Sequence, residues 1–140
     1  MNWKNITLST ALGGTTILAL SVLFTSMWSL LFPHYNPLSI PGMRAVDDPL
    51  MLLYYLQPFV QALAFAIAFH FFGSTFGSMR VFKQGIHFGL VMWMLITLPS
   101  MFLIYASMDY GETFLLTTTI TQLFEYTLAG VTIAWVFAKK

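Results

Sequence analysis

The side chain best placed to do chemistry is Glu125, an acidic residue in the middle of a long stretch without other charges. A charged side chain at the centre of a membrane helix costs about 2.5–3.5 kcal/mol on insertion scales, so such residues face protein or water and commonly serve a function. Thr118 and Gln122 precede Glu125 at spacings that bring all three to one helix face, and Tyr126 follows it. The pattern predicts a polar stripe inside the membrane.

A second polar stripe lies upstream and consists of Tyr54, Gln57 and Gln61. Polar groups in lipid need hydrogen-bonding partners, and two stripes that face each other supply them. We therefore expect the upstream stripe to provide the donors for Glu125. This intramembrane polar network has three interpretations: a static network that fixes helix packing, a site for a proton, cation or small solute, or a lateral contact with another subunit.

Two histidines, His70 and His87, lie equally far from the middle of the segment that connects the second and third predicted helices. A simple hairpin would place them opposite each other at one membrane depth, where two imidazoles can bind haem or a transition metal. The sequence places no third ligand or haem-attachment motif beside them, and histidines at a helix end can simply face the headgroups. His70 and His87 are therefore candidate ligands, and haem is the cofactor that they suggest.

Other kinds of chemistry find no support in the sequence. It contains no nucleophile–base pair, phosphate loop, HExxH motif or dinucleotide fingerprint, so no catalytic residue is predicted. The lack of cysteine excludes disulfides, thiol redox chemistry and cysteine metal sites. A net charge of +1 is too small to indicate a nucleic-acid partner.

The composition explains where these residues must sit. Of the 140 residues, 58% are hydrophobic and only 8% are charged, and the mean hydropathy is +0.77. A soluble chain carries about 25% charged residues because water must solvate its surface. The surplus apolar surface therefore faces the lipid bilayer.

The charges divide the chain into four long apolar segments, approximately 8–32, 50–72, 85–108 and 114–137, of which only the last contains a charged residue, Glu125. About 20 apolar residues suffice for one helical crossing of the hydrocarbon core, and a backbone in lipid must satisfy its own hydrogen bonds. We expect an all-α, polytopic membrane protein: residues 1–140 form a single domain of four transmembrane helices, bundled as two hairpins. The first segment is too long for the core of a cleaved signal peptide, so we expect it to be retained.

The positive charges predict the orientation. If the four spans alternate, one side of the membrane receives five of the six basic residues, namely Lys4, Arg80, Lys83, Lys139 and Lys140. Arg44 lies on the other side together with four acidic residues. The positive-inside rule then puts both termini and the central loop in the cytoplasm.

Small residues indicate where helices approach closely, since close helix contact in lipid depends on them. Ser21 and Thr25 lie four residues apart in the first span, and Gly85 and Gly89 do so in the third.

Several residues of the last two spans also form a familiar pattern, namely Gly89, Leu98-Pro99, Tyr105, Gln122, Gly130 and the closing Lys139-Lys140. Over about half of the chain this pattern resembles small uncharacterised four-helix bacterial integral membrane proteins. The resemblance implies the four-helix architecture and a bacterial inner membrane, and it carries no activity, ligand or cofactor.

Three functions follow from these observations. The first is a non-enzymatic membrane protein that acts by association, as a homo-oligomer or an accessory subunit of a larger membrane complex, because a buried acid is easier to satisfy when more than four helices surround it. The second is a small transporter or channel for protons, cations or a small solute. The third is a haem- or quinone-linked electron-transfer subunit that uses His70 and His87.

Overall fold

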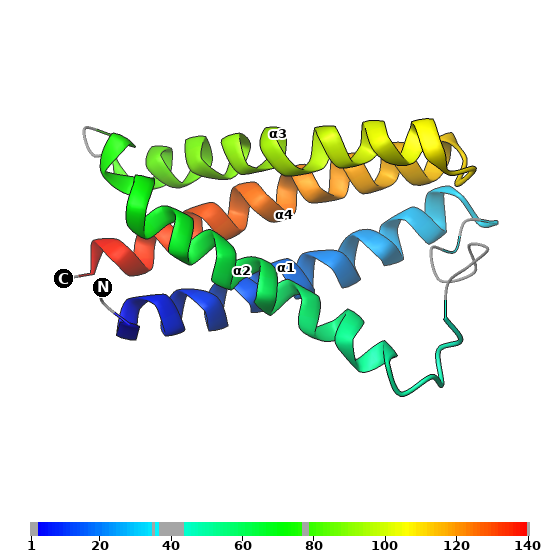
Figure 1. Cartoon of the computed structure of the whole chain (residues 1–140), viewed down its shortest axis with the longest axis horizontal. Coiled ribbons are helices and arrows are strands. Elements are labelled where there is room, and N and C mark those ends of the chain that lie inside the picture. Colours follow the sequence, from blue (N-terminus) through cyan, green and yellow to red (C-terminus); the bar gives the residue numbers. More distant parts are fainter. Residues whose placement is uncertain (1–2, 35, 37–43, 77–78, 140) are drawn as a thin grey trace.

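A computed structural model of the chain consists of four long helices (Figure 1): α1 (Trp3–Leu31), α2 (Met51–Phe72), α3 (Val81–Ser107) and α4 (Glu112–Ala138). A short 3-10 helix, η2 (Gly73–Phe76), follows α2. The structure describes residues 3–34, 36, 44–76 and 79–139, and this part contains no strand. Each long helix is apolar and long enough to cross a membrane, which confirms the predicted all-α architecture with four transmembrane helices.

The helices form two antiparallel hairpins. α3 and α4 are joined by a short turn and pack against each other along their length, while α1 packs against both α2 and α4. α1 and α4 therefore occupy the centre of the bundle. Figure 1 shows that both termini lie at one end, and that the first turns of α2 diverge from the other helices at the opposite end. We call the end opposite the termini the loop end, because the α1–α2 loop and the α3–α4 turn lie there.

Glycines hold α3 and α4 together at backbone distance. A Cβ atom on Gly130 of α4 would collide with the carbonyl oxygen of Gly85, and one on Gly89 of α3 would collide with the backbone at Tyr126. The predicted close contact at Gly85 and Gly89 is confirmed, and its partner is Gly130. Such close approach gains dispersion energy that lipid tails cannot offer, so this hairpin is a tightly packed unit.

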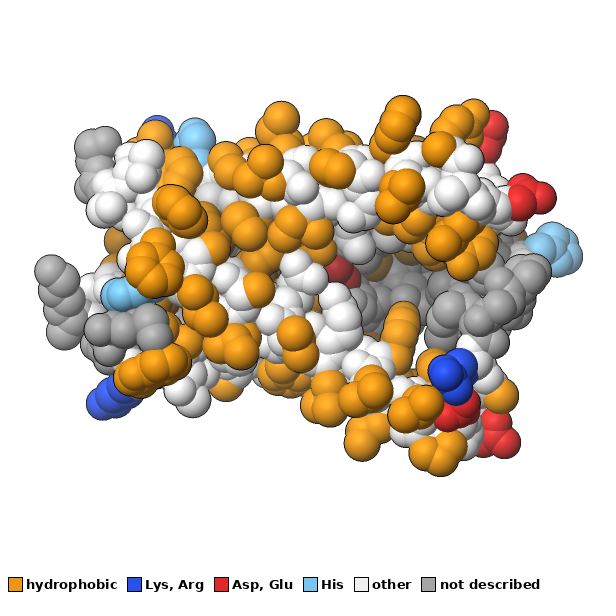
Figure 2. All heavy atoms as spheres, in the orientation of Figure 1, with side chains coloured by type: hydrophobic (Ala, Val, Ile, Leu, Met, Phe, Trp, Pro, Cys, Tyr) orange, Lys and Arg blue, Asp and Glu red, His pale blue; other side chains and the backbone are white. Residues whose placement is uncertain are grey.

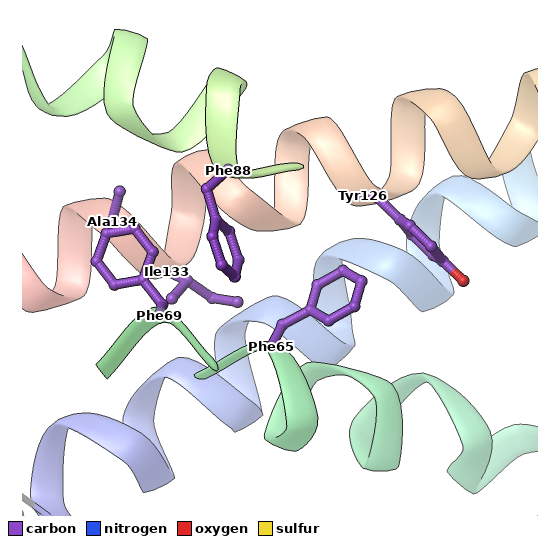
Figure 3. Close-up of a cluster of buried hydrophobic side chains, with 6 residues drawn as sticks. All are labelled: Phe65, Phe69, Phe88, Tyr126, Ile133 and Ala134. Atoms are coloured by element: carbon purple, nitrogen blue, oxygen red, sulfur yellow. The ribbon is translucent and has the colours of Figure 1, made fainter. Parts of the chain in front are cut away.

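An aromatic cluster fills the half of the bundle near the termini (Figure 3). Its buried members come from α2, α3 and α4 and are Phe65, Phe69, Phe88, Tyr126, Ile133 and Ala134. Phe65 meets Tyr126 edge to face with ring centroids 4.8 Å apart, and Phe69 meets Phe88 in the same way at 5.0 Å. Edge-to-face pairs at these distances are favourable beyond the apolar area that they bury. The cluster therefore closes this half of the molecule.

Charge differs between the two ends. The end with the termini also carries the α2–α3 connection, and the basic residues there include Lys4, Arg80, Lys83 and Lys139. Lys140 lies outside the described residues. Figure 2 shows acidic side chains gathered at the loop end, where Asp48 forms a salt bridge with Arg44 at 2.8 Å. The predicted charge separation thus corresponds to the two ends of the folded bundle.

Candidate functional site in the membrane interior

Glu125 lies near the middle of α4 and is buried, with only 5% of its surface exposed. Its Oε1 atom accepts a hydrogen bond from the hydroxyl of Ser21 on α1, with 2.5 Å between the oxygens. Ser21 reaches Glu125 because α1 packs directly on α4. A carboxyl group at this depth thus has a donor from a neighbouring helix, as the cost of burying it requires.

Two other hydrogen bonds tie α4 to its neighbours at similar depth. Thr97 of α3 donates to the side-chain oxygen of Gln122 at 2.8 Å. The indole N–H of Trp28 on α1 donates to the hydroxyl of Thr121 at 2.9 Å. The polar face of α4 therefore bonds to α1 on one side and to α3 on the other, and both contacts fix the rotation of α4 about its axis.

A cavity of about 370 Å³ opens beside Glu125, between α1, α2 and α4. Its lining combines polar side chains with apolar surface; the polar ones include Ser21, Thr25, Tyr54, Gln57, Thr118, Gln122 and Glu125. These residues come from the loop-end halves of their helices, so the cavity lies between the loop end and the aromatic cluster. Figure 2 shows the hollow between α2 and α4 on this side of the molecule. We call it the Glu125 cavity.

The structure brings most of the predicted polar network around this cavity, in an arrangement that differs from the expected one. Tyr54 and Gln57 of α2 line the cavity across from α4, which contributes Thr118. Gln57 donates to Gln61 at 3.1 Å along α2, and Gln61 is not among the lining residues. The hydrogen bond to Glu125 comes from Ser21 instead of from α2, because the diverging first turns of α2 leave the cavity between the two stripes.

Ser21, Thr97 and Trp28 are the functional positions that sequence reasoning missed. The spacing of Ser21 and Thr25 indicated a close helix contact, and nothing in it named Glu125 as the partner. Serine and threonine are common in membrane helices, where many of them bond only to their own backbone, as Ser26 does to Val22. Their role could be predicted only if it were known which helices pack against each other.

His70 and His87 have different surroundings. The His70 ring is half-buried and packs against Phe137 of α4, with 6.2 Å between the ring centroids. The exposed ring of His87 bonds through Nδ1 to the Lys83 carbonyl at 2.8 Å, one turn earlier in its own helix. The rings that meet between α2 and α3 are those of the adjacent residues, Phe69 and Phe88. One residue rotates the side chain by about 100° around a helix, so each histidine lies on a different helix face from the neighbouring phenylalanine.

Within the described ranges, no three His, Asp or Glu side chains come together in a way that would hold a metal ion. The acidic member of the cavity lining is Glu125, surrounded by hydroxyl, amide and aromatic side chains. These groups suit a proton, a single positive charge or a small hydrogen-bonding solute.

Comparison of the chain with protein-family models, with curated proteins and with solved structures finds no match.

Proposed function

We propose that this protein is a small transport protein that carries protons or another cation by way of the Glu125 cavity. The observation that carries the proposal is the cavity itself. A static network would satisfy Ser21 and Glu125 with one hydrogen bond, and lipid-facing helices could then close around it, since protein interiors pack without large voids. A space of about 370 Å³ beside a buried acid, with a few polar groups on a largely apolar lining, is instead typical of a ligand site.

The two halves of the bundle differ in a way that suits transport in a defined direction. The loop-end half contains the Glu125 cavity, and the half near the termini is filled by the aromatic cluster. A ligand in the Glu125 cavity lies on the loop-end side of the cluster, so its release at the other end requires the cluster to part. Such movement of one pair of helices against the other is the usual way in which membrane transporters expose a central site to each side in turn.

The α3–α4 hairpin is suited to be the fixed part of this movement. Gly85, Gly89 and Gly130 lock its two backbones together, whereas α2 diverges from its neighbours at the loop end. We place both termini in the cytoplasm of a bacterial inner membrane, because the basic residues gather at that end of the bundle. The Glu125 cavity then lies in the half of the bundle away from the cytoplasm.

The proposal is tested by cation movement in liposomes that contain the purified protein. The probes are protons, labelled sodium, labelled rubidium and labelled benzyltrimethylammonium, each driven by its own gradient. At least one probe should move faster than in empty liposomes, and Glu125→Gln should reduce its rate at least tenfold, because the amide retains hydrogen bonding and cannot carry charge. Glu112→Gln makes the same change at the exposed start of α4 and should move the probe like the wild type.

Two results would overturn the proposal. One is a wild-type protein that moves none of the four probes. The other is a folded Glu125→Gln variant, with an unchanged circular dichroism spectrum, that matches the wild-type rate.

A second candidate function is association with further chains, as a homo-oligomer or an accessory subunit. The observation that favours it is Gln61, a partly exposed amide in the apolar span of α2 that lies outside the cavity lining. An exposed amide in lipid is unfavourable, and another polar helix would shield it. Native mass spectrometry from lipid nanodiscs tests this reading: more than one chain in the particle supports it, and a single chain at all protein concentrations contradicts it.

A further inference from the structure

The lining of the Glu125 cavity narrows the class of solute. We propose that the cavity binds an organic cation, an amine or quaternary ammonium ion with an apolar body, in exchange for the proton of Glu125. This inference rests on the proposed transport function and specifies its substrate.

Charge is the first argument. Glu125 is the acid in the lining, and no Lys, Arg or His side chain is among the described residues around the cavity. The other titratable groups nearby are phenols, Tyr54 of α2 in the lining and Tyr126 next to Glu125 on α4. α1 contributes only hydroxyl, indole and apolar groups, and α3 faces the network through Thr97. An anionic ligand would therefore meet a carboxyl group without a balancing positive charge, whereas a cationic ligand is matched.

Aromatic rings are the second argument. Trp28 of α1, Tyr54 of α2 and Phe114 of α4 line the cavity from three sides. The face of an aromatic ring attracts a cation, and quaternary ammonium ions are recognised in proteins by such groups of rings. Leu18 and Pro58 add apolar surface between them. One acid surrounded by rings and apolar groups suits a positive head attached to a hydrocarbon body.

Size is the third argument, and it separates an organic cation from an inorganic one. Metal cations such as calcium are enclosed by six to eight oxygen ligands at about 2.3–2.6 Å. The Glu125 cavity has about 370 Å³, the space of roughly 12 water molecules, and offers one carboxyl group. A bare ion would leave most of that space unfilled, whereas a compact aromatic amine occupies it and covers the rings.

The exchange follows from the position of Ser21. Its hydroxyl donates to Oε1 of Glu125, and we assign Oε2 to the positive head of the ligand. As the cation arrives, the neutral acid gives its proton to water in the cavity, and the resulting carboxylate pairs with the cation. Protonation of the same carboxylate removes the ion pair and releases the cation. One proton and one cation thus alternate on Glu125, and the net charge in the site is conserved.

Calorimetry in lipid nanodiscs tests this inference, with benzyltrimethylammonium as the probe and benzenesulfonate as its counterpart of opposite charge. Titrations in two buffers with different heats of ionisation count the protons released. We expect one cation to bind per chain with release of a proton, and affinity to rise by up to tenfold per pH unit where free Glu125 is protonated. Benzenesulfonate, and sodium at the same concentration, should give no binding heat.

Three variants assign the residues. Glu125→Gln should weaken binding at least tenfold and remove its pH dependence. Glu125→Asp keeps the acidic group, so its binding should remain dependent on pH; it serves as the test if Glu125→Gln fails to fold. Trp28→Leu should weaken binding severalfold and leave the pH dependence intact, because it removes a ring and keeps the acid. Glu112→Gln should bind like the wild type.

The outcomes separate this inference from the function on which it rests. Movement of protons, sodium or rubidium that depends on Glu125, without binding of benzyltrimethylammonium, overturns the organic-cation assignment and leaves the transport function standing. Equal binding of benzyltrimethylammonium and benzenesulfonate, or binding without proton release at every pH, also overturns the assignment.

Discussion

Ser21 on α1 and Glu125 on α4 lie 104 residues apart in the sequence, and their oxygens are 2.5 Å apart in the fold. This hydrogen bond joins the two central helices at the inner wall of the Glu125 cavity. It makes α1 a part of the site and does not fill the space between α4 and α2. The relationship explains how one chain can satisfy a buried acid and still keep room for a ligand.

Removal of this donor should weaken the bundle. Ser21→Ala leaves the carboxyl group of Glu125 without its partner, and hydrogen bonds between membrane helices contribute about 1 kcal/mol. We expect the free energy of unfolding to fall by about that amount, measured by denaturation in mixed micelles. Ser26→Ala is the matched control, because the Ser26 hydroxyl bonds only to the Val22 carbonyl of its own helix and is exposed. Equal losses in the two variants would show that the Ser21–Glu125 bond contributes nothing specific.

The glycine contact between α3 and α4 predicts a larger effect. Gly130→Ala adds a Cβ atom where the Gly85 carbonyl already lies, so the two backbones must separate. Overpacking of this kind costs about 1–3 kcal/mol, and we expect that loss in the same unfolding assay. Ala106→Leu adds a larger group at an exposed position of α3 and should leave stability nearly unchanged. A Gly130→Ala variant as stable as the wild type would contradict the observed helix contact.

The charge pattern predicts on which side of the membrane each end of the bundle lies. Reporter fusions after Lys83 and at the C-terminus should both give cytoplasmic signals, because the positive-inside rule keeps the end rich in lysine and arginine in the cytoplasm. A fusion after Asp109, in the α3–α4 turn, should report the opposite side. A signal from outside the cytoplasm at either of the first two positions would reverse the proposed orientation of the cavity.

Asp48 at the loop end offers a prediction on pH. The backbone N–H of Leu50 and the guanidinium of Arg44 both donate to its carboxylate, and they hold its pKa below the ordinary value. A carboxyl pKa that is lower in the folded state stabilises the fold above the unfolded-state pKa, and this contribution is lost as pH falls through the folded-state pKa.

Arg44→Gln should therefore raise the pKa of Asp48 only part of the way, because the larger cause, the Leu50 N–H, remains. An NMR titration of the labelled carboxyl carbon measures the change, and Arg80→Gln at the other end of the bundle serves as the control. An unaltered Asp48 titration in Arg44→Gln would refute the role of the ion pair.

The sequence was sufficient to predict the helices, and physical reasons limit what it predicts about the site. Four apolar segments longer than 20 residues leave the backbone no alternative to helices in lipid, and Glu125 stands out because a charge in such a segment is costly. The neighbours of each helix are harder to predict, because apolar residues surround all four helices and lipid offers no strong preference between their faces. The Ser21 donor and the cavity between the two polar stripes depend on that packing order.

The histidines also show that the sequence does not predict which helix faces pack together. Equal distances from a loop predict equal depth for His70 and His87, and depth does not determine rotation about the helix axis. The residues rotated toward each other are Phe69 and Phe88, and they build the aromatic cluster that closes the bundle near the termini.

The central claim is that the Glu125 cavity is a water-filled ligand site that opens at the loop end, and the lack of natural cysteines allows a direct test. Thr118→Cys places a thiol in the cavity lining, and Phe124→Cys places one on the exposed, lipid-facing side of the same helix, next to Glu125. A membrane-impermeant thiosulfonate added from the loop end should modify Thr118→Cys, and benzyltrimethylammonium should slow this reaction. Phe124→Cys should stay unmodified, because a thiol in lipid does not ionise. Equal reaction of both variants, or none at Thr118→Cys, would contradict a ligand site in this cavity.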